Sequence, residues 1–380
     1  MKIEKNIIYP ASEAITKNNI LIDKANLVFY FGERALIEDG AVFQALKQKY
    51  PNAIIIGCST GGEIFDNDFH EESVVSIAIQ FEKTPIRACS MEITEVGQSF
   101  ENGVSLGKQL NERDLKAVFV LSEGLIIDGS KLTQGISQAI GPHIPITGGL
   151  AGDGSHFGKT VVGLNSTPRQ GQIVAVGFYG DHIRFGHGSM GGWDIFGPTR
   201  IITRSEGSVL YEIDGKPALD VYKRYLGHLS ERLPASALTF PMTIHHIDDP
   251  KTTVVRTILS VNEDDKSMNF AGTIPEGHVA QFLRGTLKHL VEGAENAALQ
   301  SLEGISNTSG SLAIMISCIG RKLLMGQRVI DEIDAVSNVF KGKTSQIGFY
   351  SYGEISPHAQ SGFCELHNQT MTITTLSEAL

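Results

Sequence analysis

Basic patches are missing from this chain. Its 380 residues carry 32 Lys and Arg against 42 Asp and Glu, a formal net charge of −10 at pH 7, and no stretch is rich in Lys or Arg. A nucleic-acid interface requires a basic surface, and an anionic membrane repels an acidic protein. We therefore expect neither nucleic acid nor membrane among the partners, and we attribute the acidity to solubility in the cytoplasm.

Cysteine pairs and long apolar runs are missing as well. The four cysteines stand apart without a CxxC pair, which argues against both a zinc site and a secreted disulfide framework. The N-terminus has no apolar stretch typical of a signal peptide, and no run approaches the roughly 18 apolar residues of a membrane helix. The sequence therefore predicts a reduced, soluble, cytoplasmic protein.

Catalytic and nucleotide-binding motifs are also absent: the sequence has no GxGxxG, P-loop lysine, GxSxG or HExxH. The glycine-rich stretch 148–154 lacks the Lys-Ser/Thr ending of a P-loop, so we interpret it as a tight corner. His245 and His246 are adjacent, and adjacent side chains on a strand point apart, which favours a surface turn over a shared metal ion. We therefore expect a protein that is not an enzyme.

What the chain does contain is a repeat. The nine residues IGCSTGGEI at 56–64 return as IGFYSYGEI at 347–355, with both Ile, both Gly and the Glu matching in register. A shorter copy, Thr-Gly-Gly, stands at 147–149. A repeated strand-to-glycine corner is typical of duplication, and such chains usually hold something small between the copies.

The surroundings of these corners repeat as well, which predicts three β-α-β units. The expected elements are strand 27–32, helix 40–50 and strand 53–57; strand 118–121, helix 130–140 and strand 144–146; and strand 312–317, helix 331–340 and strand 347–350. Two further pairs of segments predict antiparallel ribbons, 74–81 with 86–93 and 173–178 with 183–189.

These units predict an α/β fold of the mixed α+β kind with mixed sheets. We expect two intimately packed domains built from the duplicated units, residues 26–216 and 217–376, because different strand-and-helix material lies between the second and third copies. The Asp214-Gly215 step predicts a hairpin, and Pro217 suits a helix start. No Pro-, Ser- or Gly-rich linker separates the halves.

The glycine corners are the expected ligand site, because ligands gather at the carboxyl ends of parallel strands. Gly62 and Gly149 would bring bare backbone N–H groups close to a ligand. Glu63 and Glu354 hold equivalent positions after their corners. Each carboxylate either grips a ligand or caps its own loop, and the sequence leaves both roles open.

Two aromatic residues complete the predicted ligand site. Trp193, the only tryptophan, lies in the glycine-rich loop 186–198, and Tyr352 belongs to the third corner. If the glycine loops face each other, both side chains line one pocket. The alternative for Trp193 is a core plug at a strand crossing.

Taken together, several segments resemble the FIST proteins. They are Cys58–Ile64, Gly148–Gly152, Glu212–Leu219, Gly353–Pro357 and 364–372, in the expected order from about Asn26 to the last strand. The resemblance implies an N-terminal FIST domain followed by a FIST C-terminal domain. It also implies the detection of a small ligand in prokaryotic signal transduction.

The loop 187–198 and the segment 240–242 are similar to one branch of this family, the nitric-oxide-sensing haem proteins. That resemblance implies haem b as a cofactor and a separate histidine kinase or diguanylate cyclase as a partner. A haem needs a neutral His, or a thiolate, beside an apolar slot wide enough for the ring. The candidates are His187, which stands among aromatic residues, and as alternatives His358 and His367.

Three functions stay open at this point. The first is a sensor that binds haem with nitric oxide on its iron. The second is a haem-free sensor of an amino acid or related metabolite, to which the Glu and Gly corners are suited. The third is an enzyme acting on such a metabolite, which the lack of a nucleophile–base pair disfavours.

Overall fold

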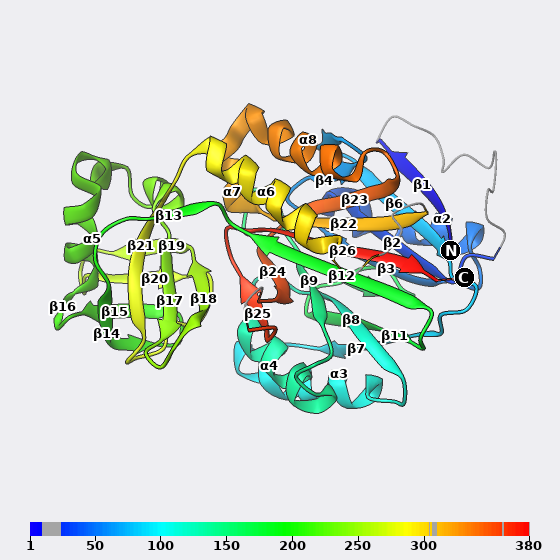
Figure 1. The fold of residues 1–380 in the computed structure, drawn as a ribbon, viewed down its shortest axis with the longest axis horizontal. Helices are drawn as coiled ribbons and strands as arrows, with labels where there is room; N and C mark the ends of the chain where they lie inside the picture. Colours follow the sequence, from blue (N-terminus) through cyan, green and yellow to red (C-terminus); the bar gives the residue numbers. More distant parts are fainter. Residues whose placement is uncertain (10–23, 304, 306–309, 359–360, 380) are drawn as a thin grey trace.

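Three strands without a polar face organise the larger part of the molecule (Figure 1). β2 (Leu27–Gly32), β8 (Leu115–Ser122) and β22 (Ser311–Cys318) are buried along nearly their whole length. Such strands are stable inside sheets that are covered on both faces. The computed structural model, in which each of the three is central to its own sheet, describes residues 1–9, 24–303, 305, 310–358 and 361–379.

The three sheets share one internal order. The first runs β1 (Lys2–Ile8), β6 (Val74–Gln80), β2, β3 (Ile54–Ser59) and β10 (Val162–Leu164). The second runs β7 (Ile86–Glu92), β11 (Gln172–Tyr179), β8, β9 (Ile146–Leu150), β24 (Gly353–Pro357) and β25 (Cys364–His367). The third runs β12 (Ile183–Met190), β26 (Met371–Glu378), β22, β23 (Thr344–Ser351), β4 (Glu63–Phe65) and β5 (Asp68–His70). In each sheet the third and fourth strands are parallel and the outer ones antiparallel.

A helix joins the two parallel strands of every sheet. These helices are α2 (Ala41–Lys49), α4 (Gly129–Ile140) and α8 (Val329–Phe340). The other helices of this part are α1 (Arg34–Ile37), α3 (Ser99–Leu110), α6 (Leu287–Ser301) and α7 (Ile319–Met325), and short 3-10 turns span Val96–Gln98 and Gly326–Arg328. The three β-α-β units and their mixed sheets confirm the predicted mixed α+β fold class. Among the described helices, none combines the length and the apolarity that crossing a bilayer requires.

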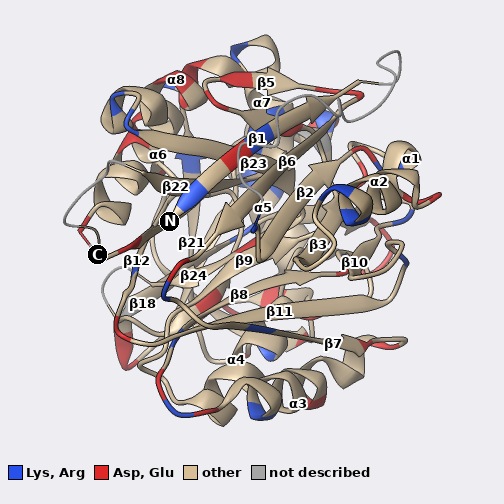
Figure 2. Ribbon diagram, turned by 90° about the vertical axis from the view of Figure 1, so that its right-hand side faces the viewer, with Lys and Arg blue, Asp and Glu red and all other residues tan. Residues whose placement is uncertain are grey.

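The inner faces of the three sheets share one hydrophobic core. Phe29 of the first sheet meets Phe119 of the second with ring centroids 5.1 Å apart, and Phe31 meets Phe349 of the third at 4.7 Å. Helices cover the outer faces: α1 and α2 lie beside the first sheet, with α3 and α4 below and α8 above in Figure 2. The body of the molecule is thus a three-sided prism with an aromatic interior.

Both predicted antiparallel ribbons are wrong. β6 and β7 follow each other in sequence but lie in the first and second sheets, and β11 and β12 lie in the second and third. The reason is that β6 already pairs with β1 and β2 on its two edges, so β7 finds its partner in β11. β11 is flanked by β7 and β8 in the same way, and β12 pairs with β26. The first and second repeats therefore each give an edge strand to the following sheet, and β1 from the N-terminus holds that position in the first sheet.

The glycine corners exchange strands as well. After β3, β9 and β23 the chain continues in another sheet as β4, β10 and β24. At these crossings a closed ring of backbone hydrogen bonds forms, from Gly61 N to Tyr350 O (2.7 Å), from Tyr352 N to Leu150 O (3.3 Å) and from Gly152 N to Ser59 O (2.8 Å). A Cβ on Gly152 would lie 2.9 Å from the nitrogen of Gly61, so only glycine fits. The three corners thus meet on the axis that relates the repeats.

A separate lobe, residues 194–284, is inserted between β12 and α6. Its sheet runs β18 (Asp249–Arg256), β17 (Met242–His246), β21 (Val279–Gly285), β14 (Arg200–Glu206), β15 (Val209–Ile213), β20 (Ser267–Phe270) and β19 (Ile258–Asn262), with β13 (Trp193–Ile195) beside β21 and β16 (Lys216–Pro217) beside β15. The lobe also holds α5 (Ala218–Leu226) and 3-10 turns at Gly227–Arg232 and Ala235–Thr239. The chain enters and leaves through β13 and β21, which pair with Trp193 opposite Gly285 (Figure 1). The two covalent connections therefore lie side by side.

Candidate functional site

A cavity of about 500 Å³ lies between the lobe and the body. We call it the interlobe cavity. The lobe lines it with Leu238 and Phe270, and the body lines it with Ile127, Ile319 and Leu366, among other residues. Cavities of roughly 300–1,000 Å³ with mostly apolar walls are typical of small-molecule sites. The interlobe cavity has the size and the character of such a site.

Two buried polar side chains in this cavity have no hydrogen-bond partner among the described residues. Both amide atoms of Asn368 are unpaired although the residue is 0% exposed, and the hydroxyl of Thr257, a residue 4% exposed, is unpaired as well. A buried polar group without a partner costs about 1–3 kcal/mol of folding free energy. Such groups are uncommon and call for a partner such as water or a ligand.

The turn that carries Asn368 is held from both sides. Gln369 takes a left-handed φ of +61°, and its carbonyl oxygen accepts a hydrogen bond from the indole Nε1 of Trp193 at 2.9 Å. The hydroxyl of Thr370 donates to a carboxylate oxygen of Glu354 at 2.8 Å. Asn368 is therefore presented to the cavity from an anchored turn between β25 and β26.

Two buried carboxylates occupy equivalent corners. Glu354 accepts hydrogen bonds from the hydroxyls of Ser351 and Thr370 at 2.9 and 2.8 Å, and Glu63 accepts two from hydroxyls, of which the one from Ser73 is 2.7 Å long. Burial raises the pKa of Glu354 to about 8 and the pKa of Glu63 to about 7, although these hydrogen bonds oppose the shift. In the structure both carboxylates brace their own loops, and Glu354 does so out of contact with solvent.

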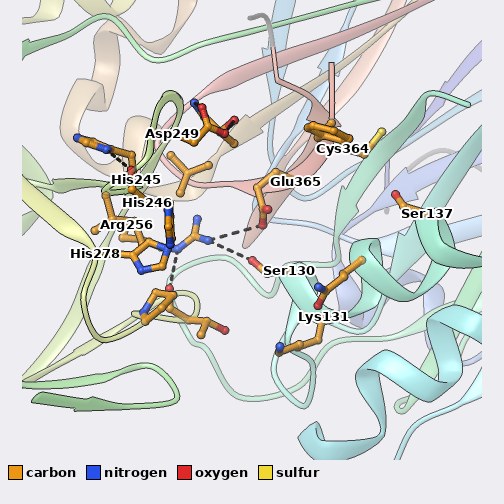
Figure 3. A pocket seen from close by; sticks show the side chains of 17 residues that line it. Ser130, Lys131, Ser137, His245, His246, Asp249, Arg256, His278, Cys364 and Glu365 are labelled. Carbon is orange, nitrogen blue, oxygen red and sulfur yellow. Dashed lines mark hydrogen bonds and ion pairs between the residues drawn. The ribbon is translucent and has the colours of Figure 1, made fainter. Parts of the chain in front are cut away.

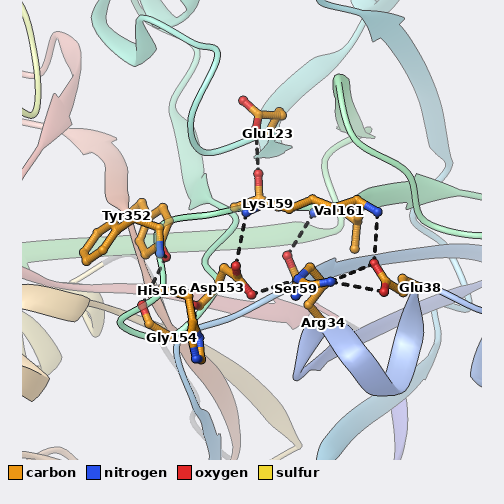
Figure 4. Close-up of polar contacts among 12 residues, drawn as sticks. Arg34, Glu38, Ser59, Glu123, Asp153, Gly154, His156, Lys159, Val161 and Tyr352 are labelled. Carbon is orange, nitrogen blue, oxygen red and sulfur yellow. Dashed lines mark hydrogen bonds and ion pairs between the residues drawn. The ribbon is translucent and has the colours of Figure 1, made fainter.

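A more polar cleft of about 410 Å³ lies at the first corner, where Gly62 and Glu63 line it. We call it the corner cleft. Arg34 Nε donates to Asp153 at 2.9 Å, and the backbone N–H of Lys159 donates to the other oxygen of Asp153 at 3.1 Å (Figure 4). Arg34 and Asp153 thus satisfy each other, whereas the interlobe cavity presents polar side chains without a described partner.

Tyr352 stands between the two hollows. It lines the interlobe cavity and stacks on Phe157 with ring centroids 4.6 Å apart. Its hydroxyl donates to the carbonyl of Gly154, at 3.0 Å, and Gly154 lines the corner cleft. Gly149 lies apart from both hollows, on β9, where it pairs with Glu354. The structure thus brings Tyr352 to a cavity wall and keeps Gly149 inside a sheet.

Arg256 ties the lobe to the body beside a third cavity of about 480 Å³ (Figure 3). This lobe residue is 3% exposed and donates to the carbonyl of Leu366 at 3.0 Å and to the hydroxyl of Ser130 at 3.1 Å. His245 and His246 line the same cavity from the lobe. Across the residues that the structure describes, no three His, Cys, Asp or Glu side chains are grouped to hold a metal ion.

Family models match both halves of the chain. The FIST N domain matches residues 26–216, and the FIST C domain matches residues 218–357. The chain belongs to the FIST family. FIST domains are associated with sensing in signal transduction. The division between the two matches runs through the lobe, with β14 and β15 before it and β17 to β21 after it.

Similar proteins leave the activity of this FIST chain open. An uncharacterized protein of Methanocaldococcus jannaschii is 27% identical over 364 residues, which is 82% of this chain and 66% of that protein. The chain thus spans just under two thirds of that relative. A chorismatase structure has a TM-score of 0.35 at 8% identity, covering 99% of this chain and 98% of its own. A cyanuric acid hydrolase from A. caulinodans has a TM-score of 0.38 at 7% identity, covering 100% and 99%. Likeness at this level supports no conclusion about activity.

The histidines that the haem-binding branch of the FIST family suggested do not line the interlobe cavity. His187 lies on β12, and burial lowers its pKa. His358 and His367 donate through Nε2 to backbone carbonyls at 2.9 and 3.1 Å, and burial lowers the pKa of His367 to about 4. The described residues that line the cavity include no histidine, and burial raises the pKa of its one thiol, Cys318, so that the thiol stays protonated. The described lining of the interlobe cavity therefore offers neither an imidazole nor a thiolate to a haem iron.

Sequence reasoning missed the residues that distinguish this FIST site. Asn368 lies in a segment that carried the family resemblance, yet nothing in its neighbours marks it as unpaired. Arg256 and Thr257 are adjacent polar residues in a segment that holds several others, so their types do not single them out. Their roles arise from contacts between the lobe and the body, which no local pattern encodes.

Proposed function

We propose that the protein is a cytoplasmic sensor that binds a small molecule in the interlobe cavity. Binding would then change the position of the lobe relative to the body. One observation carries the proposal: both the lobe and the body line the cavity. Phe270 belongs to the lobe wall and Leu366 to the body wall. A ligand that touches both walls has different contacts when the lobe moves, and this difference shifts the equilibrium. A coupling free energy of about 1–3 kcal/mol suffices for such a switch.

Contacts beside the cavity support a movable lobe. Arg256 reaches Ser130 of α4, and the hydroxyl of Thr273 in the lobe donates to Asp128 of the body at 2.7 Å. When the lobe moves, water replaces the partner in each contact, at a net cost of about 1.5–3 kcal/mol for a hydrogen bond to a charged group. The covalent connections are two neighbouring strands, so the lobe can rotate about one edge.

The proposal is for a haem-free sensor without catalytic activity. Its output would pass to a separate protein, for which the family resemblance suggests a histidine kinase or a diguanylate cyclase. The interlobe cavity supports the haem-free form because its described lining offers no imidazole. Among amino acids and related metabolites, those whose charged groups are blocked or absent suit the mostly apolar walls.

Haem b with nitric oxide on its iron stays a separate prediction of the family resemblance, with His187 as the first candidate for the axial ligand. Haem titration tests it directly. A sharp Soret band that shifts with nitric oxide and changes in His187→Ala would support this prediction. Protein that stays colourless after the addition of haem would dismiss it.

A thermal-shift screen of amino acids and neutral metabolites tests the haem-free sensor. A ligand at 100 times its Kd stabilises the folded state by about 2.7 kcal/mol, which a melting curve detects. Leu238→Phe fills the cavity and should remove the stabilisation, whereas Leu299→Phe, at a position 51% exposed on α6, should keep it. Small-angle scattering on the same samples measures the lobe movement. Hits that ignore Leu238→Phe, or that leave the scattering unchanged, would contradict the proposal.

A further inference from the structure

The two unpaired groups of the interlobe cavity come from opposite walls. Asn368 belongs to the body and Thr257 to the lobe, and both are at most 4% exposed. Asn368 offers an N–H₂ donor and a C=O acceptor side by side, and Thr257 offers a hydroxyl that donates or accepts. One molecule that bonds to both side chains would join the lobe to the body.

The charges around the cavity favour a neutral molecule. Among the described lining residues the charged side chains are Asp128 and Glu206. Asp128 already accepts hydrogen bonds from Lys131 N at 3.1 Å and from the hydroxyl of Thr273 at 2.7 Å. Glu206 is exposed at the rim. An anionic ligand would find no cation in this lining, and the burial of an uncompensated charge is costly.

The geometry points to a ligand that carries a cis-amide edge on an apolar body, as a lactam or a cyclic imide does. Such an edge sets an N–H donor beside a C=O acceptor, which matches the amide of Asn368 in two hydrogen bonds. The second lone pair of the ligand oxygen accepts from the Thr257 hydroxyl. The apolar body fills the space beside residues such as Leu238 and Ile319. This inference rests on the proposed function and adds the chemical class of the ligand.

The test compares 2-quinolinone, an apolar bicyclic lactam, with N-methyl-2-quinolinone, which lacks the donor. Calorimetry on the full chain should give a Kd at least tenfold lower for the lactam, because the methylated probe leaves the buried acceptor of Asn368 unpaired. In Asn368→Leu the two probes should bind with equal affinity. This variant should keep or raise the melting temperature, because it removes a buried amide that has no described partner.

If Asn368→Leu is unstable, two variants that each remove a buried hydroxyl provide a second test. Thr257→Val should weaken the lactam by about threefold or more. Thr374→Val removes another buried, unpaired hydroxyl, on β26 and outside the described cavity lining, and should leave both affinities unchanged. Equal binding of the two probes to the wild type overturns the inference. So does a lactam preference that survives in Asn368→Leu, or the failure of both probes to bind, which would leave water as the partner of Asn368.

The ligand class and the sensor proposal fail in different ways. Lactam binding that depends on Asn368 but leaves the scattering profile unchanged overturns the sensor proposal and upholds the ligand class. Screening hits that move the lobe and are indifferent to Asn368→Leu uphold the sensor and overturn the class.

Discussion

Trp193 donates a hydrogen bond through its indole Nε1 to the carbonyl oxygen of Gln369, at a distance of 2.9 Å. Trp193 begins β13, one of the two strands that connect the lobe, and Gln369 directly follows the unpaired Asn368. The contact therefore joins the lobe connection to the wall of the interlobe cavity. Because the chain has one tryptophan, its fluorescence reports on this place alone.

Trp193→Phe keeps an aromatic ring at the connection and removes the indole N–H. We expect the free energy of unfolding in urea to fall by about 1 kcal/mol. We also expect ligand binding to persist while the lobe movement in scattering becomes smaller. Tyr225→Phe serves as the control, because it removes a hydroxyl that accepts from Arg200 within the lobe, at 2.8 Å. Equal lobe movement in both variants would show that Trp193 does not couple the cavity to the connection.

Gly152→Ala should disrupt the ring of corner hydrogen bonds. The new Cβ would lie 2.9 Å from the backbone nitrogen of Gly61, and moving either backbone away would disrupt the corner hydrogen bonds that the N–H groups of Gly61 and Gly152 donate. We expect a loss of about 3 kcal/mol, the upper range for overpacking, in chemical denaturation. Gly97→Ala is the matched control, since its Cβ would meet no atom within 4 Å. A Gly152→Ala protein as stable as Gly97→Ala would refute the constraint at the axis.

Glu354→Gln should change how stability depends on pH. Burial raises the pKa of Glu354 from the ordinary 4.5 to about 8, so the folded state holds a proton that the unfolded chain releases above pH 4.5. The stability that this proton contributes is complete below pH 4.5 and declines toward pH 8. Two pH units at about 1.4 kcal/mol each amount to about 3 kcal/mol between pH 5 and pH 7. Glu354→Gln should remove this part of the decline, measured as melting temperature against pH. A parallel profile for the two proteins would contradict the assignment.

Glu378→Gln should show the opposite dependence. Although burial acts against it, hydrogen bonds from the backbone N–H groups of Glu82, Lys83 and Thr84 lower the pKa of Glu378 to about 2. The stability that this carboxylate contributes is complete above pH 4.5 and is lost as the pH falls toward 2. The variant should be less stable than the wild type by about 2 kcal/mol at pH 7, since hydrogen bonds to a charged group are lost. The difference should vanish near pH 2, and a constant difference across this range would exclude the carboxylate as its source.

The sequence predicts much of the fold because the central strands are apolar along their length. The strand 27–32 is found with the bounds expected, since continuous apolar residues between turn signals permit little else. The partners of β7 and β12 were not predictable in this way. Sequence adjacency favours a hairpin, but the edges of β6 and β11 are already occupied by strands from elsewhere in the chain.

The candidate site is less accessible to sequence reasoning than the fold. The glycine corners meet as a repeated motif suggests, but they meet in direct contact, and the hollow lies beside them. Thr257 and Asn368 face one cavity although more than a hundred positions separate them in the chain. Whether a polar side chain has a hydrogen-bond partner depends on residues that are distant in the sequence. A local sequence pattern cannot predict such contacts.

Because the three sheets exchange strands, a stable fold requires all three repeats. One repeat cut free would expose the edges that its neighbours now cover, and open edges recruit other chains. Three separate copies could satisfy those edges only by closing into a ring. The present chain thus has the form of a trimer whose subunits have been fused, and its cooperative unfolding should involve all three at once.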